Sequence, residues 1–242
     1  MRIAIGNLRL DSRPMIAAAL SDKDLALLRS ADMKVIDLIE LRVDLFKSCS
    51  VDYACGVFSR VKKRFQRPVI CTIRTRPEGG AWSEDEDTRY ALFEALVPLA
   101  DVVDIEIRSK LFEYVIELSH GFKKPVIASY HNLKLTPANA YLLRLLSKAG
   151  RASADITKLA LKANGMDDVA RLACFTNEHR HGNLITMSLG DKGKLSRLIN
   201  PFFGSLVTYG YVGKPKADGQ MHVRQLAEQL KMYGGKIREK QP

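Results

Sequence analysis

The sequence predicts a (β/α)₈ barrel. Eight apolar, β-branched runs recur at intervals of roughly 25 to 35 residues, which is the length of a strand followed by a helix. Segments with helical periodicity lie between these runs, and a chain of 242 residues is long enough to close such a barrel. We expect residues 1–235 to form one barrel domain and residues 236–242 to be a frayed C-terminal tail.

The expected strands are short runs rich in Val, Ile and Leu, and in chain order they span residues 2–8, 35–44, 68–74, 101–108, 125–131, 154–161, 183–189 and 205–211. An open doubly wound sheet is the alternative. Such a sheet usually has fewer strands and a glycine-rich turn after the first one. The turn after residues 2–8 is not glycine-rich, so the barrel is favoured. Two small domains would also fit the length, but no linker separates the strand–helix units.

The expected helices carry start and stop signals. Residues 21–31 begin with Ser and Asp, which cap helices, and residues 83–100 place acids in the first turn, where the helix dipole favours them. Residues 136–150 begin with Thr-Pro and end with Gly. Further helices are expected over residues 165–178 and 219–235, with a short broken one over residues 190–204.

The composition, 46% hydrophobic and 27% charged, is typical of a soluble globular protein. No apolar run approaches the roughly 20 residues of a membrane span, and the start of the chain lacks the apolar stretch of a signal peptide. The four cysteines have no paired metal or redox spacing. We therefore expect a cytoplasmic protein with reduced thiols and no membrane partner.

The net charge of +11 has two interpretations. Nucleic-acid binding requires basic residues clustered on one face, whereas here they are spread along the chain. A basic surface around a site for a small anionic molecule is the favoured interpretation. We expect no nucleic-acid partner.

Polar residues gather where the expected strands end, and in a barrel these C-terminal ends form the active site. Arg, Glu, His and Lys side chains would meet at one mouth. The residues concerned are Glu40, Arg42, Asp44, Arg74, Asp104, Glu106, His131, Lys158, Met187 and Tyr209.

Lys158 lies in the middle of the sixth expected strand, on the same face as Ile156 and Ala160. An unpaired buried ammonium is very costly. One interpretation is a Schiff-base nucleophile whose pKa is lowered toward about 7–8 by burial and neighbouring cations. The other is an internal salt bridge to Asp104 or Glu106. The ring of polar strand ends favours the nucleophile.

His131 ends the fifth expected strand and suits a general base, because its pKa lies near neutrality. A histidine that is merely hydrogen-bonded at a strand end is the alternative. After Glu78, Gly79 and Gly80 indicate a sharply turned or mobile loop that could cover the mouth.

Together these residues resemble the type I 3-dehydroquinate dehydratase family, from the second strand to the last loop. The resemblance rests on eight motifs, in order and each at a strand–helix junction: ELRVD, IRTRPEGG, DVVDIE, SYHNLKLTP, ADITKLAL, ITMSLGDKGKLSRL, FGS followed by TYG, and ADGQ. It implies a homodimeric barrel that dehydrates 3-dehydroquinate to 3-dehydroshikimate in the shikimate pathway and needs no metal or organic cofactor.

The resemblance also implies a role for each matching residue. Lys158 would form an imine with the C3 ketone, His131 would move protons, and Glu78 would orient or assist His131. Arg197 would hold the substrate carboxylate, for which a planar guanidinium is well suited. Hydroxyl contacts and the shape of the pocket would come from Glu40, Arg42, Arg74 and Gln220, and packing around the ring from Met187, Tyr209 and Ala217.

Two positions depart from the family pattern. Many relatives have Asp after the catalytic His, where this chain has Asn132, and often Ser in the last loop, where it has Lys216. Asn132 should face away from His131, since neighbouring strand residues alternate. Lys216 should change affinity more than chemistry.

Two rival functions remain. A class I aldolase or transaldolase also uses a barrel lysine, but its phosphorylated substrates favour glycine-rich turns after strands seven and eight. A non-catalytic basic binding module that has kept the barrel is the other.

Overall fold

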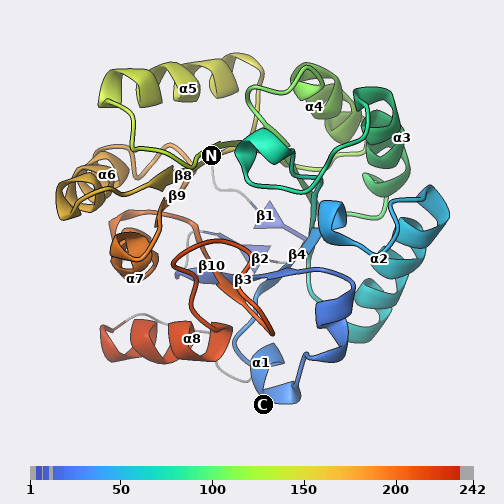
Figure 1. Cartoon of the computed structure of the whole chain (residues 1–242), viewed down its shortest axis with the longest axis horizontal. Helices are drawn as coiled ribbons and strands as arrows, with labels where there is room; N and C mark the ends of the chain where they lie inside the picture. Colours follow the sequence, from blue (N-terminus) through green and yellow to red (C-terminus); the bar gives the residue numbers. More distant parts are fainter. Residues whose placement is uncertain (1–3, 7, 11–12, 235–242) are drawn as a thin grey trace.

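The computed structural model describes residues 4–6, 8–10 and 13–234. Its centre is an eight-stranded parallel sheet in the order β10-β3-β4-β5-β6-β7-β8-β9. In Figure 1 this sheet forms a nearly closed barrel, and the helices lie around its outside. The predicted (β/α)₈ fold is confirmed.

Seven barrel strands fall within or close to the expected runs: β4 (Leu38–Arg42), β5 (Val69–Thr72), β6 (Val102–Glu106), β7 (Val126–Asn132), β8 (Ile156–Lys162), β9 (Leu184–Leu189) and β10 (Val207–Tyr211). Nearly every residue of these strands is buried. Strands covered on both faces therefore appear in the sequence as continuous apolar runs.

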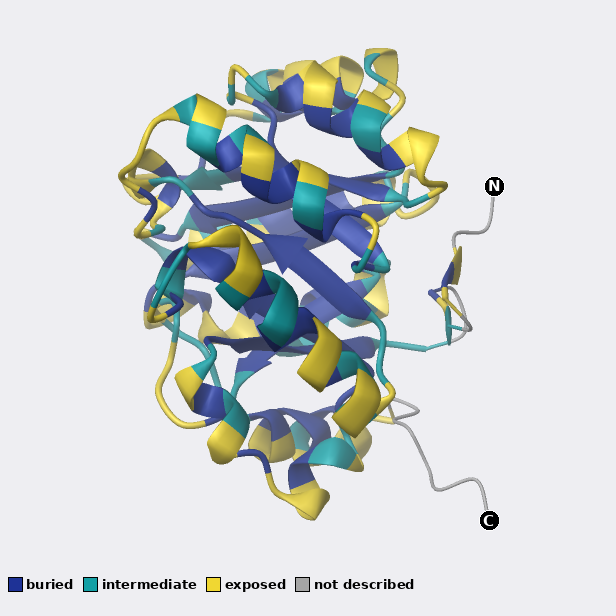
Figure 2. Cartoon of the chain, turned by 90° about the vertical axis from the view of Figure 1, so that its right-hand side faces the viewer, coloured by how far each residue is buried: buried dark blue, intermediate teal, exposed yellow. Residues whose placement is uncertain are grey.

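The first expected strand is wrong. Within the 2–8 run the structure has β1 (Ala4–Ile5), which pairs antiparallel with β2 (Leu8–Arg9) outside the barrel sheet. The first barrel strand is instead β3 (Met15–Leu20), in which three alanines follow one another. Alanine favours helices over strands in isolation. Here Ala17 packs inside the barrel, whereas Ala18 packs in the outer cluster. Ile5 packs with the interior cluster, so the β1–β2 hairpin covers one end of the barrel (Figure 2).

The sheet closes between β9 and β10 largely through side chains. One backbone hydrogen bond, from Leu206 N to Leu184 O at 2.8 Å, joins the starts of these strands. Beyond it, the Thr186 amide donates to the Ser205 hydroxyl at 3.0 Å. The Ser205 hydroxyl therefore takes the place of a backbone carbonyl that would accept this amide if β9 and β10 were paired along their length.

The α-helices are α1 (Ser30–Met33), α2 (Val51–Phe65), α3 (Glu86–Leu96), α4 (Phe112–Gly121), α5 (Asn139–Arg151), α6 (Met166–Glu178), α7 (Ser196–Ile199) and α8 (Val223–Met232). Short 3₁₀ turns are η1 (Lys23–Ala26), η2 (Val43–Leu45), η3 (Arg76–Glu78), η4 (Lys192–Leu195) and η5 (Asn200–Phe203). The helix expected over residues 21–31 is wrong, since η1 and part of α1 occupy it. The broken helix over residues 190–204 is confirmed as η4, α7 and η5.

Two apolar clusters hold the barrel together. The inner one fills the barrel with alternate strand residues such as Ile70, Ile127 and Ile156, and the outer one packs the strands against the helices. Lys158 shares its face with Ile156 and Ala160, as expected, while Leu159 belongs to the outer cluster. Within the described residues, no helix has the length and apolar character needed to cross a membrane. The expected tail, residues 236–242, lies outside the described residues.

Candidate active site

A cavity of about 300 Å³ lies where the barrel strands end. Eleven of the residues expected from the sequence line it: Glu40, Arg42, Arg74, Glu78, His131, Lys158, Met187, Arg197, Tyr209, Ala217 and Gln220. Asp44, Asp104 and Glu106, also expected at the mouth, do not line it and lie behind its wall as partners of Arg42, Arg74 and Lys158. The eleven lining residues come from β4, from the later barrel strands and from the loops that follow those strands. The fold therefore brings to one place residues that lie as far apart in sequence as Glu40 and Gln220.

Lys158 is paired with two carboxylates. Its Nζ lies 3.0 Å from Asp104 Oδ2 and 3.2 Å from Glu40 Oε1, and 4.2 Å from the centre of the Tyr209 ring. Burial alone would lower the pKa of Lys158, but the two carboxylates outweigh it and hold that pKa above its ordinary value. The expected lowering toward about 7–8 is therefore wrong for this structure, because anions rather than cations dominate around the amine.

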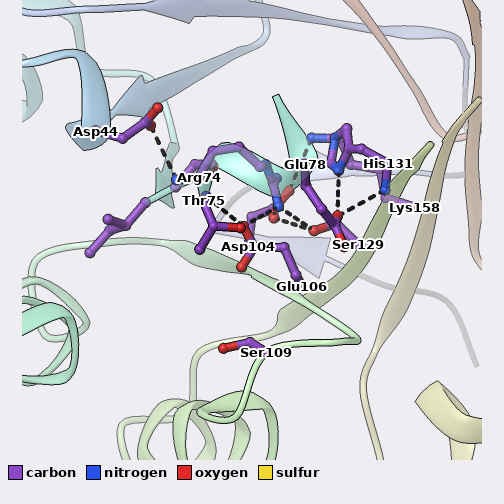
Figure 3. Close-up of polar contacts among 12 residues, drawn as sticks. Asp44, Arg74, Thr75, Glu78, Asp104, Glu106, Ser109, Ser129, His131 and Lys158 are labelled. Atoms are coloured by element: carbon purple, nitrogen blue, oxygen red, sulfur yellow. Dashed lines mark hydrogen bonds and ion pairs between the residues drawn. The ribbon is translucent and has the colours of Figure 1, made fainter. Parts of the chain in front are cut away.

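Asp104 organises the base of the site (Figure 3). It accepts hydrogen bonds from Arg74 Nη2 at 2.5 Å, from the Ser129 hydroxyl at 2.6 Å and from Lys158. Burial opposes its charge, but Arg74 and Lys158 overcome this and lower the pKa of Asp104. Of the two salt-bridge partners considered for Lys158, Asp104 is confirmed. Glu106 pairs with Arg74 and Arg89 instead.

His131 and Glu78 form a second pair. Glu78 Oε2 accepts the backbone amide of His131 at 2.8 Å and lies 3.1 Å from His131 Nδ1. Burial, with Arg74 and Lys158 nearby, holds the pKa of His131 well below its ordinary value, so the ring is neutral at pH 7. Burial also raises the pKa of Glu78 to about 7. When Glu78 is ionised, Nδ1 carries the proton that it donates to the carboxylate, which leaves Nε2 as a free base.

The amine and the imidazole share a face of neighbouring strands. In the β7–β8 ladder Ser129 is opposite Lys158, and His131 is opposite Ala160. His131 therefore lies two residues nearer the strand ends than the position opposite Lys158, with its side chain on the same side. A molecule bound between them would meet both groups.

Arg197 is buried without a carboxylate. Its Nε donates to Gly219 O at 2.9 Å, and its Nη atoms donate to Tyr209 O and Asp218 O, each at 3.3 Å. No carboxylate in the described part of the chain pairs with it, and burial lowers the pKa of Arg197 to about 10. A buried cation without an anion is unfavourable, so this guanidinium is suited to an anionic ligand.

Other expected binding residues are held by the protein itself. Arg42 makes a two-point contact with Asp44, at 2.8 and 2.7 Å. Gln220 Oε1 accepts the backbone amides of Lys216 and Ala217, which leaves its amino group free of this contact. These residues shape the cavity wall.

The first departure from the family pattern lies outside the cavity wall. Asn132 Nδ2 donates to the Tyr130 hydroxyl at 3.1 Å, and its Oδ1 accepts the amides of Lys134 and Leu135 at 3.0 Å. Asn132 therefore holds the loop after β7 and faces away from the cavity, as strand alternation requires.

Ser129 and Lys162 were not identified from the sequence as site residues. Ser129 anchors Asp104, and Lys162 lines the cavity. A signal existed for both, because Ser129 precedes His131 by two residues and Lys162 follows Lys158 by four. Even spacing places each pair on one strand face.

Fold and site together define a (β/α)₈-barrel enzyme whose cavity combines a buried lysine, a neutral histidine and a buried arginine suited to an anion. The family described as Type I 3-dehydroquinase matches residues 15–237. The chain belongs to this family and is a hydro-lyase.

Individual relatives agree with this assignment. The 3-dehydroquinate dehydratase of Thermodesulfovibrio yellowstonii is 34% identical over 93% of this chain and 98% of its own length. The crystal structure of the Geobacillus kaustophilus enzyme has a TM-score of 0.88 at 27% identity and covers 97% of this chain and 96% of its own. That of the Aquifex aeolicus enzyme has a TM-score of 0.79 at 37% identity, with coverages of 90% and 98%. The aldolase alternative and the non-catalytic module are therefore set aside.

Proposed function

We propose that this chain converts 3-dehydroquinate to 3-dehydroshikimate and water through an imine between Lys158 and the C3 ketone. The observation that carries the proposal is the buried amine of Lys158, which lines one cavity with His131 and Arg197. An amine, a base and an anion-binding group are what an imine-forming elimination on a keto acid requires.

Positive charge on the nitrogen is the central feature of this chemistry. Lys158 must first lose a proton, and neutral His131 can accept it. The amine then attacks C3, His131 returns the proton to the C3 oxygen, which leaves as water, and a protonated imine forms while His131 is again neutral. Asp104 and Glu40, which stabilise the ammonium, stabilise this iminium for the same reason. The charge lowers the barrier for removing a proton from C2, because the electron pair moves into nitrogen.

His131 would then act twice. Its Nε2 takes the C2 proton, with Glu78 holding Nδ1–H, and an enamine forms. The resulting imidazolium returns the proton to the C1 hydroxyl, which leaves as water. The conjugated iminium that remains is hydrolysed by the equivalent of the water lost earlier, releasing the product and the Lys158 ammonium.

The remaining residues would bind the substrate. Arg197 receives the carboxylate as a two-point contact. Hydroxyl binding and cavity shape are assigned to Glu40, Arg42, Arg74 and Gln220, and ring packing to Met187, Tyr209 and Ala217. A homodimer in the cytoplasm, bound to neither nucleic acid nor membrane, completes the proposal. The dimer is checked by sedimentation equilibrium.

Borohydride trapping tests the mechanism. Reduction in the presence of 3-dehydroquinate should give a stable adduct, and peptide mass mapping should place it on Lys158. The matched control is Lys162→Ala, which removes a second lysine of the same cavity and should leave the adduct in place. Lys158→Ala should abolish both the adduct and turnover. An adduct on Lys162, or turnover at the parent rate in Lys158→Ala, would overturn the assignment.

A further inference from the structure

The loop of residues 212–220, here called the lid loop, joins β10 to α8 and supplies part of the cavity wall. Lys216, Ala217, Asp218 and Gln220 line the cavity. The two ends of the loop are tied together, because Tyr211 N donates to Met221 O at 3.0 Å. The position of the loop between these ends therefore determines where its cavity residues lie.

One side of the lid loop rests on the turn after β9. Gly219 adopts φ +74°, and a Cβ at this position would lie 2.4 Å from Gly190 O. Arg197 donates to the carbonyls of Gly219 and Asp218. The ion pair on this side, Lys162 with Asp218, spans 3.7 Å with the Asp218 side chain 81% exposed. Such exposed pairs contribute little, so backbone contacts hold this side.

The other side rests on η1 through a buried ion pair. Lys216 Nζ lies 2.7 Å from Asp24 Oδ2, and the two side chains are 12% and 8% exposed. Asp24 is itself fixed, because Oδ2 also accepts the Ser21 amide and hydroxyl, each at 2.7 Å. Gly213 packs against the same turn, since a Cβ there would lie 2.6 Å from Leu27 Cδ1.

This pair connects directly to the cavity wall. The backbone amide of Lys216 donates to Gln220 Oε1 at 2.6 Å, and the amide of Ala217 donates to the same oxygen. A shift of Lys216 therefore moves Ala217 and Gln220 as well. Removing one partner of a buried pair leaves an unpaired charge, which the lid loop relieves by moving Lys216 toward water.

We propose that Asp24 is a positioning residue, which through its ion pair with Lys216 holds the lid loop in the place that substrate binding requires. Asp24 does not line the cavity and acts only through Lys216. The identity of the substrate rests on the function proposed above, whereas the position of the loop does not.

The test compares Asp24→Asn with Asp22→Asn. The asparagine can still accept the Ser21 amide but loses the charge that Lys216 needs. We expect KM for 3-dehydroquinate to rise about tenfold, which corresponds to the interaction energy of a coupled pair of residues. We expect kcat to stay within about twofold of the parent value. Asp22 is the matched control, because it bonds Lys47 N and the Tyr53 hydroxyl and makes no ion pair with the lid loop. Its variant should keep the parent KM.

Two further measurements complete the test. Lys216→Gln should raise KM to a similar extent, and the double variant should be no worse than either single one. Trypsin should cut after Lys216 faster in Asp24→Asn than in Asp22→Asn, whatever the substrate is. Unchanged trypsin cleavage would overturn the inference, as would additive KM effects or a fall in kcat alone. Faster cleavage in a protein that does not turn over 3-dehydroquinate would support the inference and contradict the proposed function.

Discussion

Two opposing demands meet at Lys158. Attack on a ketone needs a neutral amine, yet Asp104 and Glu40 favour the ammonium and raise the pKa of Lys158. At an ordinary lysine pKa, about one amine in 2,500 is neutral at pH 7, and here the fraction is smaller. The iminium of the proposed mechanism is also a cation, so the same carboxylates would favour the covalent state. Under that proposal the site makes the first proton transfer harder and stabilises the intermediate from which water is eliminated.

Glu78 leads to a prediction about pH. The pKa of Glu78 is raised to about 7 by burial, so the carboxylate is ionised above this pH and protonated below it. Only the ionised form requires a proton on His131 Nδ1 and leaves Nε2 free. We expect kcat/KM to rise with pH through about 7 and then level off, as measured with 3-dehydroquinate across pH 5 to 9.

Glu78→Gln provides the control for this pH profile. The amide oxygen can still accept both N–H groups of His131, but the side chain no longer titrates. The rise of kcat/KM near pH 7 should disappear. A rise well below pH 6.5 should remain, because burial lowers the pKa of His131. If kcat/KM of this variant still rose near pH 7, the group that titrates there would not be Glu78.

At the level of elements, the sequence predicted the later barrel strands better than the first one. Seven of the eight barrel strands could be read from apolar runs because they are buried on both faces. β3 could not, since its three consecutive alanines favour a helix in isolation. Most of the polar residues lining the cavity could be predicted because they lie in the barrel strands or in the segments that follow them, although Lys162 was missed. The partner of Lys216 could not be predicted, because Asp24 lies 192 residues away in the sequence. From the sequence, Asp24 is an acidic residue in the first turn of an expected helix.

The loop after β5 depends on a glycine with no unusual backbone angle. A Cβ on Gly80 would lie 1.9 Å from Arg74 O, and neither backbone can move freely, because Trp82 N donates to the same carbonyl at 3.1 Å. We expect Gly80→Ala to lower the free energy of unfolding by about 1–3 kcal/mol, measured by urea denaturation.

Gly56 is the matched control for this substitution. It lies inside α2, where a Cβ would meet only Arg60 Nη1 at an ordinary 3.5 Å. Gly56→Ala should raise the free energy of unfolding by about 0.5–1 kcal/mol, the usual gain within a helix. If both variants were stabilised, the close approach of Gly80 to the Arg74 carbonyl would not constrain this loop.

At the scale of the whole molecule, the barrel lets distant charges act on one small volume. Strand ends carry Glu40, Arg74 and Lys158 to the same cavity. Arg197 remains a buried cation, and its partners among the described residues are backbone carbonyls and the thioether of Met187. Around this site the chain carries 38 basic and 27 acidic residues. The long-range field of the molecule and the local field of the cavity therefore both favour an anion.

This excess charge predicts how salt affects capture of the substrate. With a net charge of +11, the protein attracts an anionic substrate at low ionic strength, where the Debye length is about 30 Å at 0.01 M but about 8 Å at 0.15 M. We expect kcat/KM for 3-dehydroquinate to fall severalfold over this range, while kcat, which follows binding, changes little. An uncharged carboxamide analogue, measured as a competitive inhibitor, is the matched control, and its inhibition constant should be nearly independent of salt. Equal salt dependence for the anion and the carboxamide would show that ions act on the protein itself, not on its attraction for the substrate.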